Sequence, residues 1–156
     1  MSEMRAGGLA VAFASALFLL HVQEAQAMGN LCLFSALSGV VLDHGKPVEG
    51  ARIERSFTWQ SNGETGVDET HTDARGSFSL PVIFRRSLLA SLLPHEPFIR
   101  QTILIHHAGK TYQAWMFNKG EYAENGELGG RPISLVCRLE AEPAHRDGVF
   151  GICEPQ

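Results

Sequence analysis

The amino-acid sequence predicts an all-β protein, a β-sandwich of about seven strands in antiparallel or mixed sheets, with one short helical segment. Three observations predict this fold class. Apolar and polar residues alternate along several short segments, which is typical of strands with one buried face. Glycines stand between these segments, where turns are needed. Only one segment has a leucine-rich pattern typical of a helix.

The first half of the chain contains four of the expected strands. The clearest alternation lies in residues 51–60, where Ala51, Ile53, Phe57 and Trp59 are separated by polar residues. Three shorter strands are expected at residues 37–42, 67–72 and 77–80, with turns at Gly45, Gly63, Gly66 and Gly76.

The second half contains the helical segment, a hairpin and one further strand. Residues 85–93 are predicted to form a short helix that ends at Pro94. Residues 98–107 and 110–117 alternate on either side of Ala108-Gly109, which predicts a β-hairpin. Residues 133–139 form another half-buried strand, whose inward face includes Cys137.

The N-terminal residues 1–27 are predicted to be a cleaved secretion signal. Residues 9–20 are an unbroken apolar run, and Ala25-Gln26-Ala27 is a small-x-small cleavage site. The run is shorter than the roughly 20 apolar residues of a membrane-spanning helix. We therefore expect an exported protein of the bacterial periplasm or beyond, with one domain at residues 28–156 and no membrane span after the signal is removed.

The charge of the exported domain argues against a nucleic-acid partner. Removing Glu3, Arg5 and Glu24 from the totals of 13 Lys+Arg and 17 Asp+Glu leaves 12 and 15, a net charge of -3. A binder of DNA or RNA normally has a basic surface. Hydrophobic residues make up 44% of the chain, enough to build a core, so disorder is not expected.

Three cysteines remain after removal of the signal: Cys32, Cys137 and Cys153. An odd number permits one bridge and one free thiol, or a link between chains. A bridge between Cys137 and Cys153 is favoured because closing a loop of about 15 residues contributes on the order of 3 kcal/mol and fixes the C-terminal tail. A bridge between Cys32 and Cys153 stays open as the alternative.

Three segments resemble the carboxypeptidase regulatory-like domains. They are Gly39-Val40-Val41, residues 45–53 (GKPVEGARI) and residues 72–80 (TDARGSFSL). The resemblance implies a sandwich of transthyretin-like (prealbumin-like) topology, and the chain is also similar to small secreted bacterial proteins built on this domain. In that family the domain is usually a non-catalytic structural or binding module.

Catalytic motifs are not evident in the sequence. No Gly-x-Ser-x-Gly elbow is present. The hydroxyisourate hydrolases share the transthyretin-like fold, but their C-terminal Tyr-Arg-Gly-Ser is replaced here by Cys153-Glu154-Pro155-Gln156. We therefore predict no enzyme and no cofactor, and keep a hydrolase or metal-dependent enzyme as the least favoured alternative.

One short segment offers weak candidates for metal ligands. Strand alternation places Glu69 and His71 on one face, where they could form an acid–base pair or bind a metal ion. Two ligands do not complete a metal site, so a solvated strand face is the favoured reading. A zinc site would require His106 or His107 to converge on them.

The long loop at residues 118–132 is the main candidate for a binding surface. Loops of this length in a compact domain are often functional or disordered. Both interpretations, a functional loop and a flexible connection, are kept here. Aromatic side chains in and beside the loop would provide contacts, and its acidic residues would attract a basic partner. The candidate binding residues are Trp115, Phe117, Lys119, Glu121, Tyr122, Glu124, Glu127 and Arg131.

Together these features predict an exported binding or interaction module of the bacterial envelope, with a protein or an envelope glycan as its partner. The alternative is a periplasmic immunity protein that neutralises a delivered toxin. The oligomeric state is left open, since open sheet edges and an unpaired cysteine both permit a dimer.

Overall fold

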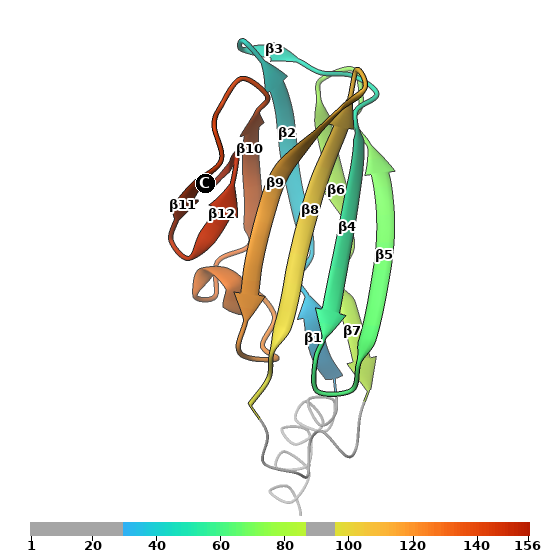
Figure 1. The fold of residues 1–156 in the computed structure, drawn as a ribbon, viewed down its shortest axis with the longest axis vertical. Coiled ribbons are helices and arrows are strands. Elements are labelled where there is room, and N and C mark those ends of the chain that lie inside the picture. The colour runs from blue at the N-terminus through green and yellow to red at the C-terminus, as the bar shows by residue number, and fades with distance from the viewer. Residues whose placement is uncertain (1–29, 87–95) are drawn as a thin grey trace, which may run out of the picture.

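The computed structural model describes residues 30–86 and 96–156, and it confirms an all-β sandwich. In Figure 1 a large sheet faces the viewer, and a second sheet lies behind it. Within the described residues the one helical element is a short 3-10 turn, η1 (Gly126–Leu128). No helix in this part of the chain is long and apolar enough to cross a membrane.

The large sheet contains six strands. Their order across the sheet is β11 (Ala144–Arg146), β12 (Val149–Gly151), β9 (Lys110–Lys119), β8 (Ile99–His107), β4 (Arg52–Trp59) and β5 (Glu64–His71). All neighbouring strands are antiparallel. In the described part of the chain, β5 therefore forms one edge of the sheet, and the short β11 forms the other.

The other two sheets are smaller. The five-stranded sheet has the order β13 (Cys153–Pro155), β10 (Ile133–Arg138), β2 (Leu37–Asp43) and β3 (Lys46–Pro47), and β6 (Ser77–Leu80) also pairs with β2. β10 and β2 are parallel, so this sheet is mixed. A two-stranded sheet joins β1 (Asn30–Phe34) to β7 (Ile83–Arg86).

Each of the seven predicted strand segments is a strand in the structure, and the predicted hairpin turns at Ala108-Gly109. Both turn residues have positive φ, 49° and 75°, as the two-residue turns of tight hairpins require. Six further strands, β1, β3, β7, β11, β12 and β13, are two to five residues long and carry too little alternation to be identified. In the predicted helix, Arg85 and Arg86 belong to β7, and the remainder lies outside the described residues.

The core lies between the two larger sheets. On β4 every second residue is buried, and the buried set includes Arg55 with Ile53, Phe57 and Trp59. The Phe57 ring packs over Gly66 of β5, where an added Cβ would lie 2.3 Å from the ring. Only glycine leaves room for this contact.

A register shift changes which residues of β9 face the core. The ladder between β8 and β9 shifts between Ile103 and Leu104, and the adjacent residues Ala114 and Trp115 are both fully buried. Beyond the shift, Trp115 and Lys119 are buried, whereas Met116 between them is exposed. The irregularity thus places Lys119 in the interior.

Candidate functional site

The predicted disulfide joins Cys137 to Cys153. These residues are direct partners in the antiparallel ladder between β10 and β13, so the bond holds the C-terminal strand against the five-stranded sheet. Cys32 is free and buried. Of the two pairings left open by the sequence, the favoured one is confirmed.

A cluster of buried polar side chains fills the space between β1, β8, β9 and η1. Its members are Ser35, Gln101, Lys119 and Glu127, each at most 4% exposed. The centre of the cluster is the Glu127 carboxylate. One oxygen, Oε1, accepts hydrogen bonds from Gln101 Nε2 at 2.7 Å and from the Ser35 backbone N–H at 3.1 Å. The other, Oε2, accepts from Ser35 Oγ at 2.7 Å and from Lys119 Nζ at 3.0 Å.

These contacts decide the charge of Glu127. Burial by itself would raise the pKa of the carboxyl group. Hydrogen bonds from Gln101 and Ser35, together with the positive charge of Lys119, outweigh that cost and lower the pKa below its usual value. Glu127 is therefore a carboxylate at neutral pH.

Cys32 lies at the edge of the same cluster. Its Sγ is 3.6 Å from Lys119 Nζ and 3.5 Å from Ser35 Oγ. Burial raises the pKa of the thiol, although the contacts with Ser35 and Lys119 oppose that shift. The thiol therefore stays protonated, which is typical of a structural cysteine.

The cluster also anchors the long loop. The Asn125 N–H donates to Ser35 Oγ at 2.8 Å, and the Cys32 N–H donates to the carbonyl oxygen of Tyr122 at 3.0 Å. The Tyr122 hydroxyl accepts a hydrogen bond from Trp59 Nε1 at 2.9 Å. The loop is thus attached to the sandwich at several points.

The structure divides the candidate binding residues into three groups. Trp115, Lys119 and Glu127 are buried, and Phe117 and Tyr122 are partly buried against the core. The exposed members are Glu121, Glu124 and Arg131. The eight residues therefore do not form one contact surface, because the register shift turns Trp115 and Lys119 inward and Glu127 pairs with Lys119.

An arginine lies beside Glu69 on the strand face that carries the weak metal-ligand candidates Glu69 and His71. Both residues are exposed on β5. Arg52 of β4 donates to Glu69 at 3.0 Å and to Glu54 at 2.7 Å. In the ladders Arg52 is paired with His71 on one side and with His106 on the other, so β4 separates the strands that carry the two histidines.

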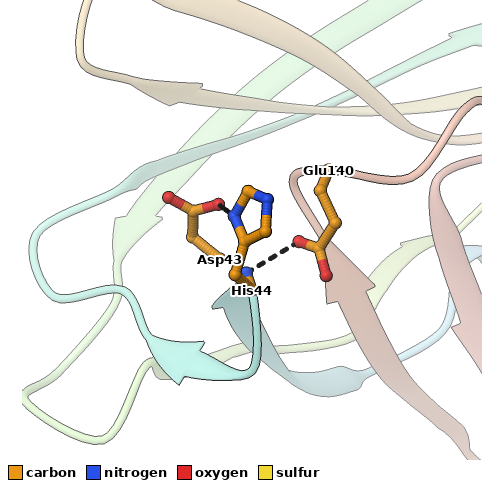
Figure 2. A group of neighbouring side chains, drawn as sticks. All are labelled: Asp43, His44 and Glu140. Atoms are coloured by element: carbon orange, nitrogen blue, oxygen red, sulfur yellow. Dashed lines mark hydrogen bonds and ion pairs between the residues drawn. The ribbon is translucent and has the colours of Figure 1, made fainter.

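Three other potential metal ligands lie together in the part of the chain that the structure describes. They are Asp43, His44 and Glu140, all exposed. Figure 2 shows that the His44 ring lies beside the Asp43 carboxylate, with Nδ1 2.7 Å from Oδ1. On the other side, the Glu140 carboxylate accepts a hydrogen bond from the His44 backbone N–H at 3.0 Å. This bond lowers the pKa of Glu140. The hydrogen bonds stabilise the β2–β3 turn, where His44 has a φ of 49°.

A groove of about 340 Å³ lies between β5 and β7. At its base the buried Arg55 guanidinium donates through Nε to Asp68 at 2.9 Å, with a second bond through Nη2, and through Nη1 to the Pro81 carbonyl at 2.7 Å. Val67 and Phe84 line the same groove and are 70% and 40% exposed.

The sequence interpretation missed Arg55 and Gln101, although a signal was present. Each occupies an inward position of a strand, Arg55 between Ile53 and Phe57 and Gln101 between Ile99 and Ile103. A polar residue at such a position needs a buried partner. Identifying that partner requires the fold, because Asp68 and Glu127 lie on other elements.

Comparison with known proteins identifies the family. A family model described as a domain of unknown function, DUF6795, matches residues 37–142, more than half of the chain. The match contains Arg55, Gln101, Lys119 and Glu127. The chain matches no curated protein and no solved structure. By the extent of this match, the chain belongs to the DUF6795 family.

Proposed function

We propose that the protein is a non-catalytic, exported binding module of the bacterial envelope that takes an extended segment of a protein partner along β5. The observation that carries this proposal is the groove at the edge of the large sheet. β5 is eight residues long, and among the described residues it pairs with β4 on one side only. An edge strand of this kind presents backbone donors and acceptors that an added strand can pair with.

The side chains around this edge favour a peptide with an apolar anchor. Four large hydrophobic residues are exposed among those described, and two of them, Val67 and Phe84, line this groove. An apolar side chain of the partner would cover them, since exposed apolar groups gathered in one place typically mark an interaction site. Arg55 and Asp68 form a rigid polar base, held by two parallel hydrogen bonds.

The predicted signal peptide and the resemblance to carboxypeptidase regulatory-like domains support the same proposal. Export would place the module in the envelope, where the Cys137–Cys153 bond persists. In the carboxypeptidase regulatory-like family, which the sequence resembles, the domain usually serves as a binding or structural unit. A glycan partner would use hydrogen bonds rather than strand pairing, so the test below separates the two partner classes.

The test uses the exported protein purified from the envelope of cells expressing the full chain. A library of random peptides is panned against it, and the affinity of the enriched peptides is measured. We expect peptides rich in β-branched and apolar residues, with binding reduced at least about tenfold by Val67→Lys, since a buried charge opposes the apolar contact. Met116→Lys is the matched control, because Met116 is 39% exposed on β9, outside the groove.

Hydrogen exchange provides the second measurement. A bound peptide should slow the exchange of backbone amides in β5. Enriched peptides that bind Val67→Lys and Met116→Lys equally well would place the binding site elsewhere. Failure to enrich any peptide, together with binding of an envelope glycan, would replace a protein partner with a carbohydrate.

A second candidate function is a periplasmic immunity protein. It is favoured by the anchored loop, which presents Glu121 and Glu124 to solvent from a fixed base on Ser35 and Lys119. If a toxin gene lies beside this gene, co-expression of the two should protect the cell. Glu121→Lys with Glu124→Lys should abolish protection, whereas Val67→Lys should leave it intact. The reverse pattern would assign protection to the groove.

A further inference from the structure

The buried cluster brings together an amine, a carboxylate and a carboxamide. The two oxygens of Glu127 are shared between them: Oε2 accepts from Lys119 Nζ at 3.0 Å, and Oε1 accepts from Gln101 Nε2 at 2.7 Å. One carboxylate therefore contacts both a nucleophilic amine and the nitrogen of a neighbouring carboxamide. This arrangement goes beyond what anchoring the loop requires.

The strand register keeps the amine and the carboxamide adjacent. In the β8–β9 ladder Gln101 is paired with Phe117, and Lys119 is paired with Ile99. Gln101 and Lys119 are thus diagonal neighbours on the inner face of the sheet. Diagonal neighbours in an antiparallel pair lie about 7–8 Å apart at the backbone, within reach of two long side chains.

The orientation of the Gln101 amide is fixed by its acceptors. Nε2 donates to the Leu33 carbonyl at 2.9 Å as well as to Glu127, so the nitrogen must point toward both oxygens. Oε1 is buried and has no hydrogen-bond partner among the described residues. A buried carbonyl without a partner is costly, and in native proteins such a group often marks a functional or strained position.

We propose that Lys119 and Gln101 become joined by an intramolecular isopeptide bond, with Glu127 transferring the proton. The Lys119 amine attacks Cδ of Gln101, and a new Cδ–Nζ bond forms as the Cδ–Nε2 bond breaks. Nζ loses two protons to Glu127 in turn. Glu127 delivers one of them to Nε2, which leaves with its bonding electron pair as ammonia, and keeps the other, so that it ends as a carboxylic acid. No oxidant, reductant or cofactor enters the balance.

The surroundings favour this reaction over its competitors. The three groups are held together by the fold, so the reaction needs no diffusional encounter. Burial excludes the water that would hydrolyse the amide instead. The product is an uncharged amide beside a protonated Glu127, so both buried charges of the ion pair are removed together. Cys32 lies near Lys119 as a rival nucleophile, but its thiol stays protonated because burial raises its pKa.

The test is the intact mass of the exported protein, measured after denaturation and reduction. We expect a mass lower than the sequence requires by one ammonia, about 17 Da. Lys119→Arg removes the nucleophile and Glu127→Gln removes the proton carrier, so both should have the full mass. Lys110→Arg alters an exposed lysine of the same strand and should keep the deficit, as should Cys32→Ser. The wild-type mass decides the proposal even if the variants at buried positions fold poorly.

Peptide mapping locates the bond. Trypsin cleaves after Arg100, Lys110 and Lys119 but not at Arg131, which precedes Pro132. A linked Lys119 resists cleavage, so residues 101–110 should be recovered covalently joined to residues 111–138. After cleavage at Arg100, Gln101 is the N-terminal residue of peptide 101–110 and can lose ammonia by cyclising. That reaction leaves the two peptides separate, so recovery of the joined product excludes it.

Two results would overturn the proposal. A wild-type protein of full mass, with residues 111–119 released normally, means that no bond forms. A deficit of one ammonia that persists in Lys119→Arg and disappears in Cys32→Ser would mean that Gln101 reacts with the thiol instead.

Discussion

Arg55 and Lys119 face the interior from the same sheet, yet they meet very different partners. Arg55 is fully buried, but the side chain of its partner Asp68 is 37% exposed at the groove. Lys119 and Glu127 are both fully buried at the side chain. The first ion pair connects the core to the surface, whereas the second is closed off from solvent.

The difference predicts different roles for the two pairs. An ion pair that reaches solvent keeps part of its hydration, so it can support a binding surface at modest cost. A pair enclosed by protein loses its hydration and depends on added hydrogen bonds, which Ser35 and Gln101 provide. The Arg55 pair suits recognition, and the Lys119 pair suits anchoring and covalent chemistry.

The largest effect is expected from breaking the closed pair. Lys119→Met leaves the Glu127 carboxylate buried without its cation and should lower the free energy of unfolding by about 3–5 kcal/mol. Where the isopeptide bond has formed, the variant loses this cross-link instead of the ion pair. Urea denaturation followed by tryptophan fluorescence measures the change.

The control for this prediction is Lys110→Met, at the exposed start of β9, which should change stability by less than about 0.5 kcal/mol. The double variant Lys119→Met with Glu127→Met should recover part of the loss, since it removes both buried charges together. If Lys119→Met is as stable as Lys110→Met, the closed pair contributes nothing to the fold.

A smaller effect is expected at the open pair. Arg55→Met removes the donor to the Pro81 carbonyl and the cation over the Phe34 ring, 5.0 Å from its centroid. The Asp68 carboxylate, however, can be hydrated after the substitution, because its side chain is 37% exposed. The free energy of unfolding should therefore fall by about 1–3 kcal/mol. A loss equal to that of Lys119→Met would show that solvent access does not separate the two pairs.

The strands could be predicted from the sequence because alternation depends only on local pattern. The segment 51–60 shows this well, since its buried face follows the apolar residues closely. The disulfide was predictable because only three cysteines remained to be paired and one pairing closed a short loop.

The closed ion pair could not be predicted, because its surroundings depend on contacts between elements that are distant in the sequence. Ser35 and Glu127 are 92 positions apart in the chain, and Lys119 turns inward only because the β8–β9 register shifts near Ala114. A bulge of one residue reverses which side chains face the core, and no local sequence pattern indicates this bulge. Trp115 and Lys119 are therefore buried, away from the predicted binding surface, and Glu127 is buried against Lys119.

The smallest effect is expected at an exposed carboxylate outside both pairs. Asp73 Oδ1 accepts the backbone N–H groups of Ser77 at 2.9 Å and Arg75 at 2.8 Å, and these bonds lower its pKa. A lowered folded-state pKa adds stability above the unfolded value, near 3.8, and that stability is lost as the pH falls through the folded value. Asp73→Asn keeps an acceptor oxygen but cannot titrate.

Wild type should therefore be slightly more stable than Asp73→Asn at neutral pH, and the difference should shrink as the pH is lowered below about 4. Urea denaturation of both proteins across this range measures the difference. Glu127 and Glu140 titrate in the same direction, but they are present in both proteins and cancel in the comparison. A difference that does not vary with pH would mean that the charge of Asp73 plays no part in its turn. A difference that grows toward acid would reverse the sign of its contribution.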